Sequence, residues 1–148
     1  MNDVRENKQE LQATIQALGN AAASVLPKDW ERVVVGYFIA GENNVSHLQF
    51  HTVTTSSDDY IDLMDESWDS DEFDDAIIEV QQLCKKLKSI CCAANDNWTA
   101  ITFSLMADGT FNIDYAYDVI EDYDSTFILK WQSLYLNFGG THGTIYTS

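Results

Sequence analysis

The sequence predicts an α+β protein with a mainly antiparallel sheet of two hairpins and with helices on one face of that sheet. Apolar residues recur at helical spacing in three segments, and β-branched and aromatic residues dominate or alternate in four others. The strands come in adjacent pairs, which favours hairpins over parallel crossovers. The expected order is α-β-β-(β)-α-β-β-α, in which the bracketed strand is a possible short edge strand.

The first helix is expected over residues 3–25, and the first hairpin follows it. Pro27 ends this helix or lies just beyond its end, because the residue before a proline disfavours the α conformation. The hairpin strands are expected at 30–40 and 45–54, with a turn at 41–44. The helix has one apolar face, formed by Val4, Leu11, Ile15, Leu18, Ala22 and Val25. Alternation on the second strand places Leu48 and Phe50 opposite His47, Gln49 and His51.

The strongest helical pattern covers residues 71–92. Ser70 is a suitable N-cap for it, and acidic residues near its start and lysines toward its end complement the helix dipole. The preceding stretch, 55–69, is compatible with a short edge strand and with an acidic loop. The apolar face of this helix consists of Phe73, Ile77, Val80, Cys84, Leu87 and Cys91.

The second hairpin is expected over residues 98–117, and a last helix from about 125 to 138. Gly109 follows Asp108 at the bend, and this pair favours a tight turn because glycine adopts a positive φ without strain. Ser125 is the expected cap of the last helix, whose apolar face is formed by Phe127, Trp131, Leu134 and Phe138. We expect residues 1–138 to form one domain and the Gly- and Thr-rich residues 139–148 to be a loose tail.

The net charge excludes several classes of partner. Twenty-four Asp and Glu stand against eight Lys and Arg, which gives a formal net charge of -16. Nucleic acids and anionic membranes are bound through clustered Lys and Arg, so neither is an expected partner. Residues 1–25 lack the apolar core of a signal peptide, and no stretch approaches the roughly 20 apolar residues of a membrane span. We therefore expect a cytoplasmic protein that is monomeric when free.

The remaining candidate side chains favour structural roles over chemistry. The three cysteines have no C-x-x-C spacing, and Cys84 and Cys91 lie on an apolar helix face, as buried core thiols do. His47 and His51 are about 13 Å apart at strand rise, too far to share a metal, and both are expected to be half-exposed. The sequence has no phosphate-binding loop, nucleophile elbow or zinc-protease motif. We expect no cofactor and no catalytic activity.

Eleven of the 24 acidic residues lie within residues 58–79, with no Lys or Arg among them. We call this stretch the acidic segment. It also contains Tyr60, Met64 and Trp68, and exposed side chains of these types are typical of interface anchors. A solvated face would explain the charges alone, and the aromatic residues could belong to a core, but the combination favours a docking surface. The predicted partner-binding residues are Asp58, Asp59, Asp62, Asp65, Glu66, Trp68, Asp69, Asp71, Glu72 and Asp75. A second cluster could carry the contact instead, namely Asp114, Asp118, Glu121, Asp122 and Asp124.

The chain resembles the YezG-like immunity proteins, the antitoxins that accompany polymorphic toxins of bacteria. The matching segments are LPKDWERV at 26–33, SDEFDDAIIEVQQL at 70–83, NWTAITFSLMADGTFNIDYAYDVI at 97–120 and FILKWQSLYLN at 127–137. The resemblance implies that the protein neutralises a cognate toxin domain, often a nuclease, delivered by neighbouring cells in contact-dependent growth inhibition or made by the same cell. It implies no catalytic residues, and it implies structural roles for Trp30, Trp98, Asp108, Gly109 and Tyr115.

The charge is consistent with that implied function. A nuclease surface is basic because it holds phosphates, so an acidic protein can occupy it and exclude the substrate. We therefore expect an antitoxin that covers the active or substrate-binding surface of a basic toxin domain. Two alternatives remain open: an acidic adaptor or regulator that binds another basic protein, and a hydrolase that uses the acidic segment with a divalent ion.

Overall fold

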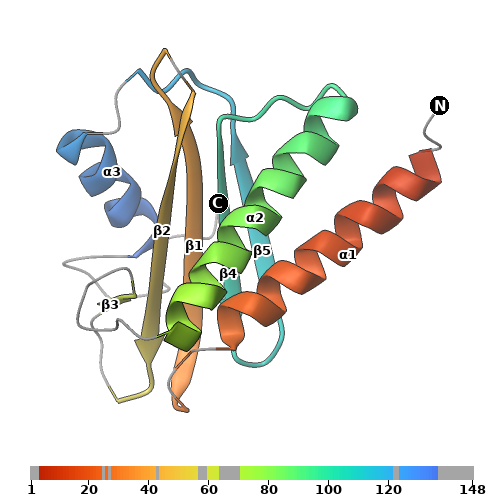
Figure 1. Ribbon diagram of the computed structural model, residues 1–148. Helices are drawn as coiled ribbons and strands as arrows, with labels where there is room; N and C mark the ends of the chain where they lie inside the picture. Colours follow the sequence, from red (N-terminus) through yellow and green to blue (C-terminus); the bar gives the residue numbers. More distant parts are fainter. Residues whose placement is uncertain are drawn as a thin grey trace. The chain divides into compact units, whose positions relative to one another are not determined.

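The computed structural model describes residues 4–24, 26, 28–42, 44–56, 60–63, 71–121 and 124–136. The chain forms two compact units, each made from separate stretches: Met1–Leu26 with Glu66–Trp98, and Pro27–Asp65 with Thr99–Ser148. The element order in Figure 1 confirms the α+β class and the predicted α-β-β-(β)-α-β-β-α sequence. That residues 1–138 form one domain stays a prediction, and the predicted tail lies outside the described residues.

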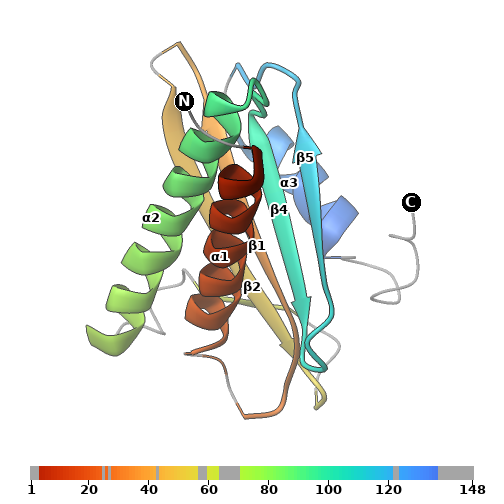
Figure 2. The same cartoon turned by 90° about the vertical axis from the view of Figure 1, so that its right-hand side faces the viewer.

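The helical unit contains α1 (Val4–Ala23) and α2 (Asp71–Ala93), which pack together and run in opposite directions (Figure 2). The helical spacing in the sequence correctly predicted the described parts of both apolar faces. Some residues that entered those predictions lie outside the described part of the chain, namely Val25, Pro27, Ser70 and the side chains of Val4 and Phe73. The buried residues of these faces are Leu18 and Ala22 from α1 and Val80, Cys84, Leu87 and Cys91 from α2.

The other unit contains a sheet whose described strands follow the order β3-β2-β1-β4-β5 and pair antiparallel throughout. The predicted edge strand exists, since Ile61 and Asp62 pair with Thr52 and His51. The rest of the 55–69 stretch is described only at residues 55–56, 60 and 63. The strands are β1 (Trp30–Ala40), β2 (Val45–Thr54), β3 (Ile61–Asp62), β4 (Ala100–Met106) and β5 (Phe111–Ala116).

The turn of the second hairpin has the chemistry that its sequence predicted. Gly109 has a φ of 95°, a backbone conformation that side chains other than glycine rarely adopt. Its N–H donates to the carbonyl of Met106 at 2.9 Å, and the Asp108 carboxylate accepts from the backbone N–H of Thr110 at 2.9 Å. The Thr110 hydroxyl also donates to this carboxylate at 2.7 Å, and the bonds from the Thr110 hydroxyl and backbone N–H lower the pKa of the Asp108 carboxyl group, because they favour its charged form.

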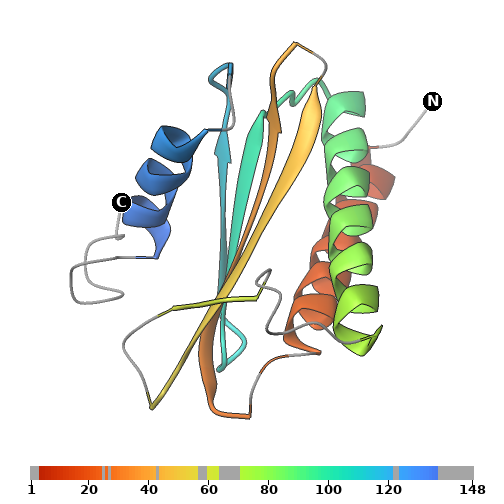
Figure 3. The ribbon, with the colours of Figure 1, turned by 60° about the vertical axis from the view of Figure 1, so that its left-hand side comes forward.

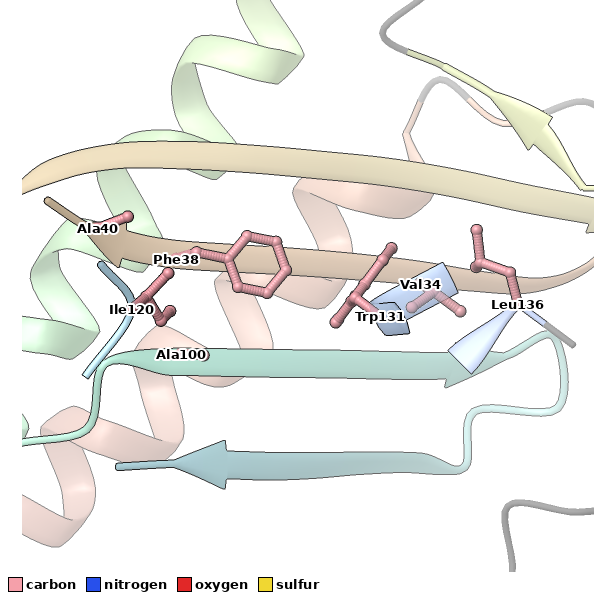
Figure 4. Close-up of a cluster of buried hydrophobic side chains, with 7 residues drawn as sticks. All are labelled: Val34, Phe38, Ala40, Ala100, Ile120, Trp131 and Leu136. Carbon is pink, nitrogen blue, oxygen red and sulfur yellow. The ribbon is translucent and has the colours of Figure 1, made fainter. Parts of the chain in front are cut away.

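The last helix, α3 (Ser125–Tyr135), lies on one face of the sheet (Figure 3). Trp131 anchors it: its indole N–H donates to the Thr102 hydroxyl at 3.0 Å, and its ring meets the Phe38 ring edge-on at 5.5 Å between centroids. Figure 4 shows both side chains within the buried cluster between helix and sheet. α3 thus covers one face of the sheet, and that the helices share one face stays a prediction.

Two predictions about α3 were wrong. The N-cap is Asp124 and not Ser125, because the Asp124 carboxylate accepts the backbone N–H of Phe127 at 2.9 Å. Leu134 is not part of the buried face, since its side chain is 50% exposed. Tyr135 packs on Trp131 instead, with 5.6 Å between ring centroids, because residues four apart lie over one another on a helix. The helix ends at Tyr135, and Phe138 lies outside the described residues.

Candidate functional site

Four of the ten residues predicted to bind a partner lie among the described residues. Asp62 is exposed on β3, Asp71 and Glu72 are the first two residues of α2, and Asp75 is exposed on the next turn of that helix. Asp62 belongs to the sheet unit and the other three to the helical unit, so their joining into one surface stays a prediction. The others, Asp58, Asp59, Asp65, Glu66, Trp68 and Asp69, lie outside the described residues.

The sheet unit contains a groove of about 510 Å³ beside α3, which we call the α3 groove. One wall is the helix, with Phe127, Trp131 and Leu134, and the other is the chain that leaves β5, with Val119 and Ile120. Its volume lies within the usual range of roughly 300–1,000 Å³ for binding sites. No pattern in the sequence predicted this groove, although four residues of the second acidic cluster line it, and the fifth, Asp122, lies outside the described residues.

Charge on the described lining of the α3 groove is predominantly negative. Asp118, Glu121 and Asp124 line it and are exposed, and Asp114, which is half-buried within β5, also lines it. Lys130 is the cationic side chain of this described lining. Four carboxylates against one ammonium group make a negative local potential that attracts cationic ligands.

A polar network lies at the floor of the α3 groove. The Thr102 hydroxyl accepts the Trp131 indole N–H, and Thr102 and Asp114 both hydrogen-bond to the Tyr135 hydroxyl. Burial raises the pKa of Tyr135, and the negative charge of Asp114 and its hydrogen bond act in the same direction. The bond with Thr102 opposes this shift. The Tyr135 hydroxyl therefore stays protonated at neutral pH, and the network holds α3 against β4 and β5.

His51 was expected to be half-exposed, and this expectation was wrong. The residue is 2% exposed, and its ring centroid lies 5.9 Å from that of Trp131. Its Nε2 lies 2.6 Å from the side-chain oxygen of Gln49. Alternation along β2 gave the correct face, but α3 covers that face at His51. Burial lowers the pKa of His51, and the negative charge of Asp62 offsets part of that shift.

The buried imidazole predicts a stability that depends on pH. Because the pKa of folded His51 lies below the ordinary value of 6.5, its contribution is present above pH 6.5 and is lost as the pH falls through the lower, folded value. Stability should fall by at most about 1.4 kcal/mol per pH unit in that window. Urea unfolding at three pH values between 7.5 and 5.5 measures this slope, and His51→Gln should flatten it. Equal slopes for both proteins would contradict the assignment.

The structure confirms that two of the three cysteines are core thiols, as the sequence predicted. Cys84 and Cys91 are buried, and burial raises the pKa of Cys84 to about 12, so its thiolate is scarce at neutral pH. Cys92 is exposed.

Among the described residues, His, Cys, Asp and Glu form no group of three or more that could hold a metal ion. None of the helices in the described part of the chain is both long and apolar enough to cross a membrane.

Comparison with known protein families identifies what kind of protein carries this surface. A family model described as immunity protein YezG-like matches residues 11–140, which is most of the chain. The chain belongs to the YezG-like immunity protein family. A comparison with curated proteins found no match. The resemblance seen in the sequence is thus confirmed.

Membership of the YezG-like family indicates an immunity function, in which a cognate toxin is bound. Several residues of the segments that match the family have structural roles in this fold. Trp98 is fully buried, and the Lys88 ammonium group lies 4.9 Å from its ring centroid and donates to its backbone carbonyl. Asp108 and Gly109 form the hairpin turn described above. Among the described residues of this YezG-like chain, the α3 groove and the exposed acids are candidate features for binding a partner.

Proposed function

We propose that this protein is an antitoxin that neutralises a basic toxin domain, a nuclease, by covering its active or substrate-binding surface. The observation that carries the proposal is membership of the YezG-like immunity family. The net charge of -16 supplies the physical reason, because a surface that holds phosphates must be basic and attracts an acidic protein. Inhibition by occupation requires no catalytic group and no cofactor, and a monomer in the cytoplasm meets the toxin where its substrate lies.

The acidic segment is the proposed main contact. Its described members support this role, because Asp62, Asp74, Asp75 and Glu79 are all exposed. Carboxylates at the rim of an interface accelerate encounter, whereas an aromatic anchor slows dissociation. We assign the first role to the acids of residues 58–79 and the second to Trp68.

Survival of bacteria tests this function directly. The candidate toxin is the C-terminal domain of whichever protein the gene immediately upstream encodes, and this domain is expressed from an inducible promoter, with and without the antitoxin. We expect the domain alone to stop growth and to degrade nucleic acid, and co-expression to restore growth to the level of uninduced cells. A catalytically inactive toxin domain should be captured by the purified antitoxin as a stable complex.

Three outcomes would contradict the proposal. Growth arrest that persists despite a full level of folded antitoxin would exclude neutralisation of this toxin. Capture of a basic protein that has no toxicity would instead favour an acidic adaptor. Turnover of a phosphoester by the purified antitoxin, abolished by substitution of a pair of its aspartates, would show that the protein is a hydrolase.

A further inference from the structure

Val119 has an apolar side chain that the fold leaves exposed to solvent on an ordered backbone. It is 83% exposed, yet the residues on both sides of it are anchored. The carbonyl of Asp118 accepts the Thr99 hydroxyl at 2.6 Å, and Ile120 bridges to Ala40 and accepts the Gly41 N–H at 2.9 Å. Figure 4 shows the Ile120 side chain within the buried cluster. Because Ile120 points inward and the backbone is fixed, Val119 must project outward.

Leu134 faces the same groove from the helix. Its side chain is 50% exposed on the wall formed by α3, while Val119 lies on the wall that follows β5. Trp131 and Phe127 from the helix and Phe38 from β1 continue this apolar lining inward. Two exposed aliphatic side chains at the rim of an apolar groove, both on ordered backbone, resemble the preorganised anchors of a protein interface.

The charges of the groove select the chemistry of its occupant. Asp118, Glu121 and Asp124 are exposed beside these apolar groups, so an apolar ligand with acidic flanks would be repelled. A small molecule would be held inside the groove and would leave the Val119 rim in water. A polypeptide segment can fill the groove and also cover the rim, and Lys or Arg next to its apolar residue would meet the carboxylates.

We propose that the α3 groove receives a segment of the toxin domain in which a large apolar side chain is flanked by Lys or Arg. This inference rests on the proposed immunity function and adds a second contact to the acidic segment. The apolar side chain packs between Val119 and Leu134 above Trp131, and the flanking cations face Asp118 and Glu121. The carboxylates should govern mainly the association rate, and the apolar contact mainly the dissociation rate.

Matched serine substitutions at exposed apolar residues test the apolar contact. Val119→Ser and Leu134→Ser should each weaken binding of the inactivated toxin domain roughly tenfold, mainly through faster dissociation. Leu129→Ser is the control, because Leu129 is 61% exposed on the same helix but does not line the groove. It should bind as the wild type does. Thermal unfolding of each variant checks that the fold is intact.

A matched pair of charge variants tests the rim. Asp118→Asn combined with Glu121→Gln should slow association severalfold at low salt, and this difference should shrink as salt is added. Glu10→Gln combined with Glu42→Gln changes the net charge by the same amount at exposed positions that do not line the groove. This control should retain most of the wild-type association rate.

The outcomes separate this inference from the function on which it rests. If wild-type antitoxin neither binds nor neutralises the toxin domain, the proposed function fails and the inference fails with it. If the wild type binds and the folded groove variants bind equally tightly, the inference alone is wrong. Loss of affinity in the groove variants but not in Leu129→Ser supports it. Overlapping peptides of the toxin domain then identify the segment, and binding confined to peptides without Lys or Arg would overturn the assignment.

Discussion

Replacing Gly36 by valine is expected to lower the free energy of unfolding by about 3 kcal/mol. Gly36 lies on β1, beneath the α3 helix, and a Cβ atom there would stand 2.6 Å from Cζ of Phe38 and 2.6 Å from Cζ2 of Trp131. Both rings are buried in the cluster under α3, so neither can move aside without disturbing its neighbours. Glycine at this position permits the close approach of the Trp131 ring to the sheet.

Chemical denaturation of the wild type and of Gly36→Val measures this effect. A double-mutant cycle gives its cause: Gly36→Val should cost less in a Trp131→Phe background, because phenylalanine lacks the outer indole ring that the new side chain would meet. Gly109→Ala is a control for backbone strain, since a Cβ at Gly109 meets nothing within 4 Å. It should cost only about 1 kcal/mol, from the positive φ. An unchanged free energy of unfolding in Gly36→Val would show that α3 does not pack here as described.

Neutralising five carboxylates of the acidic segment is expected to slow association with the toxin domain by roughly tenfold or more at low salt. The variant carries Asn or Gln at Asp65, Glu66, Asp69, Asp71 and Glu72. Exposed carboxylates act on encounter through a long-range potential, which salt screens over about 8 Å at physiological ionic strength. Wild type and variant should therefore converge in association rate as salt rises, while the dissociation rate changes less. Protection of cells should weaken in parallel.

Two further variants locate the contact. Trp68→Ala should act mainly on dissociation, as the loss of an interface anchor does. The Asp118→Asn and Glu121→Gln variant of the α3 groove provides the comparison for charge. Wild-type association and full protection in the five-carboxylate variant, with its fold intact, would show that the acidic segment is a solvated face. A slower association in the groove variant alone would assign the main contact to the second acidic cluster.

Local patterns of side chains predicted the described elements closely. The spacing of Val80, Cys84 and Leu87 predicted both α2 and its buried face, because a helix places residues three and four apart on one side. Asp108 and Gly109 predicted the hairpin turn, because the ability to adopt a positive φ without strain is a property of glycine itself. The family also followed from the sequence, since its matching segments keep their order along the chain.

Other features required the geometry of the folded backbone and the contacts between segments. The N-cap of α3 is Asp124 and not the predicted Ser125, since only the folded backbone shows which side-chain oxygen accepts the Phe127 N–H. The acids of residues 114–124 were visible in the sequence as a cluster, but the groove beside them was not. It exists because α3 packs on β1 and β4 through Trp131 and leaves the chain after β5 standing apart from the helix.

The sequence by itself determined the α+β class, the element order, the acidic character of the surface and the family. The class, the element order and the acidic character depend on composition and on periodicities that a few neighbouring residues define, and the family depends on segments that match in order along the chain. Only the tertiary structure decided that His51 is buried, that Leu134 and Val119 are exposed, and that an apolar groove with an acidic rim lies between α3 and the chain after β5. Burial and concavity depend on what other segments cover, and a residue's own pattern along the chain does not contain that information.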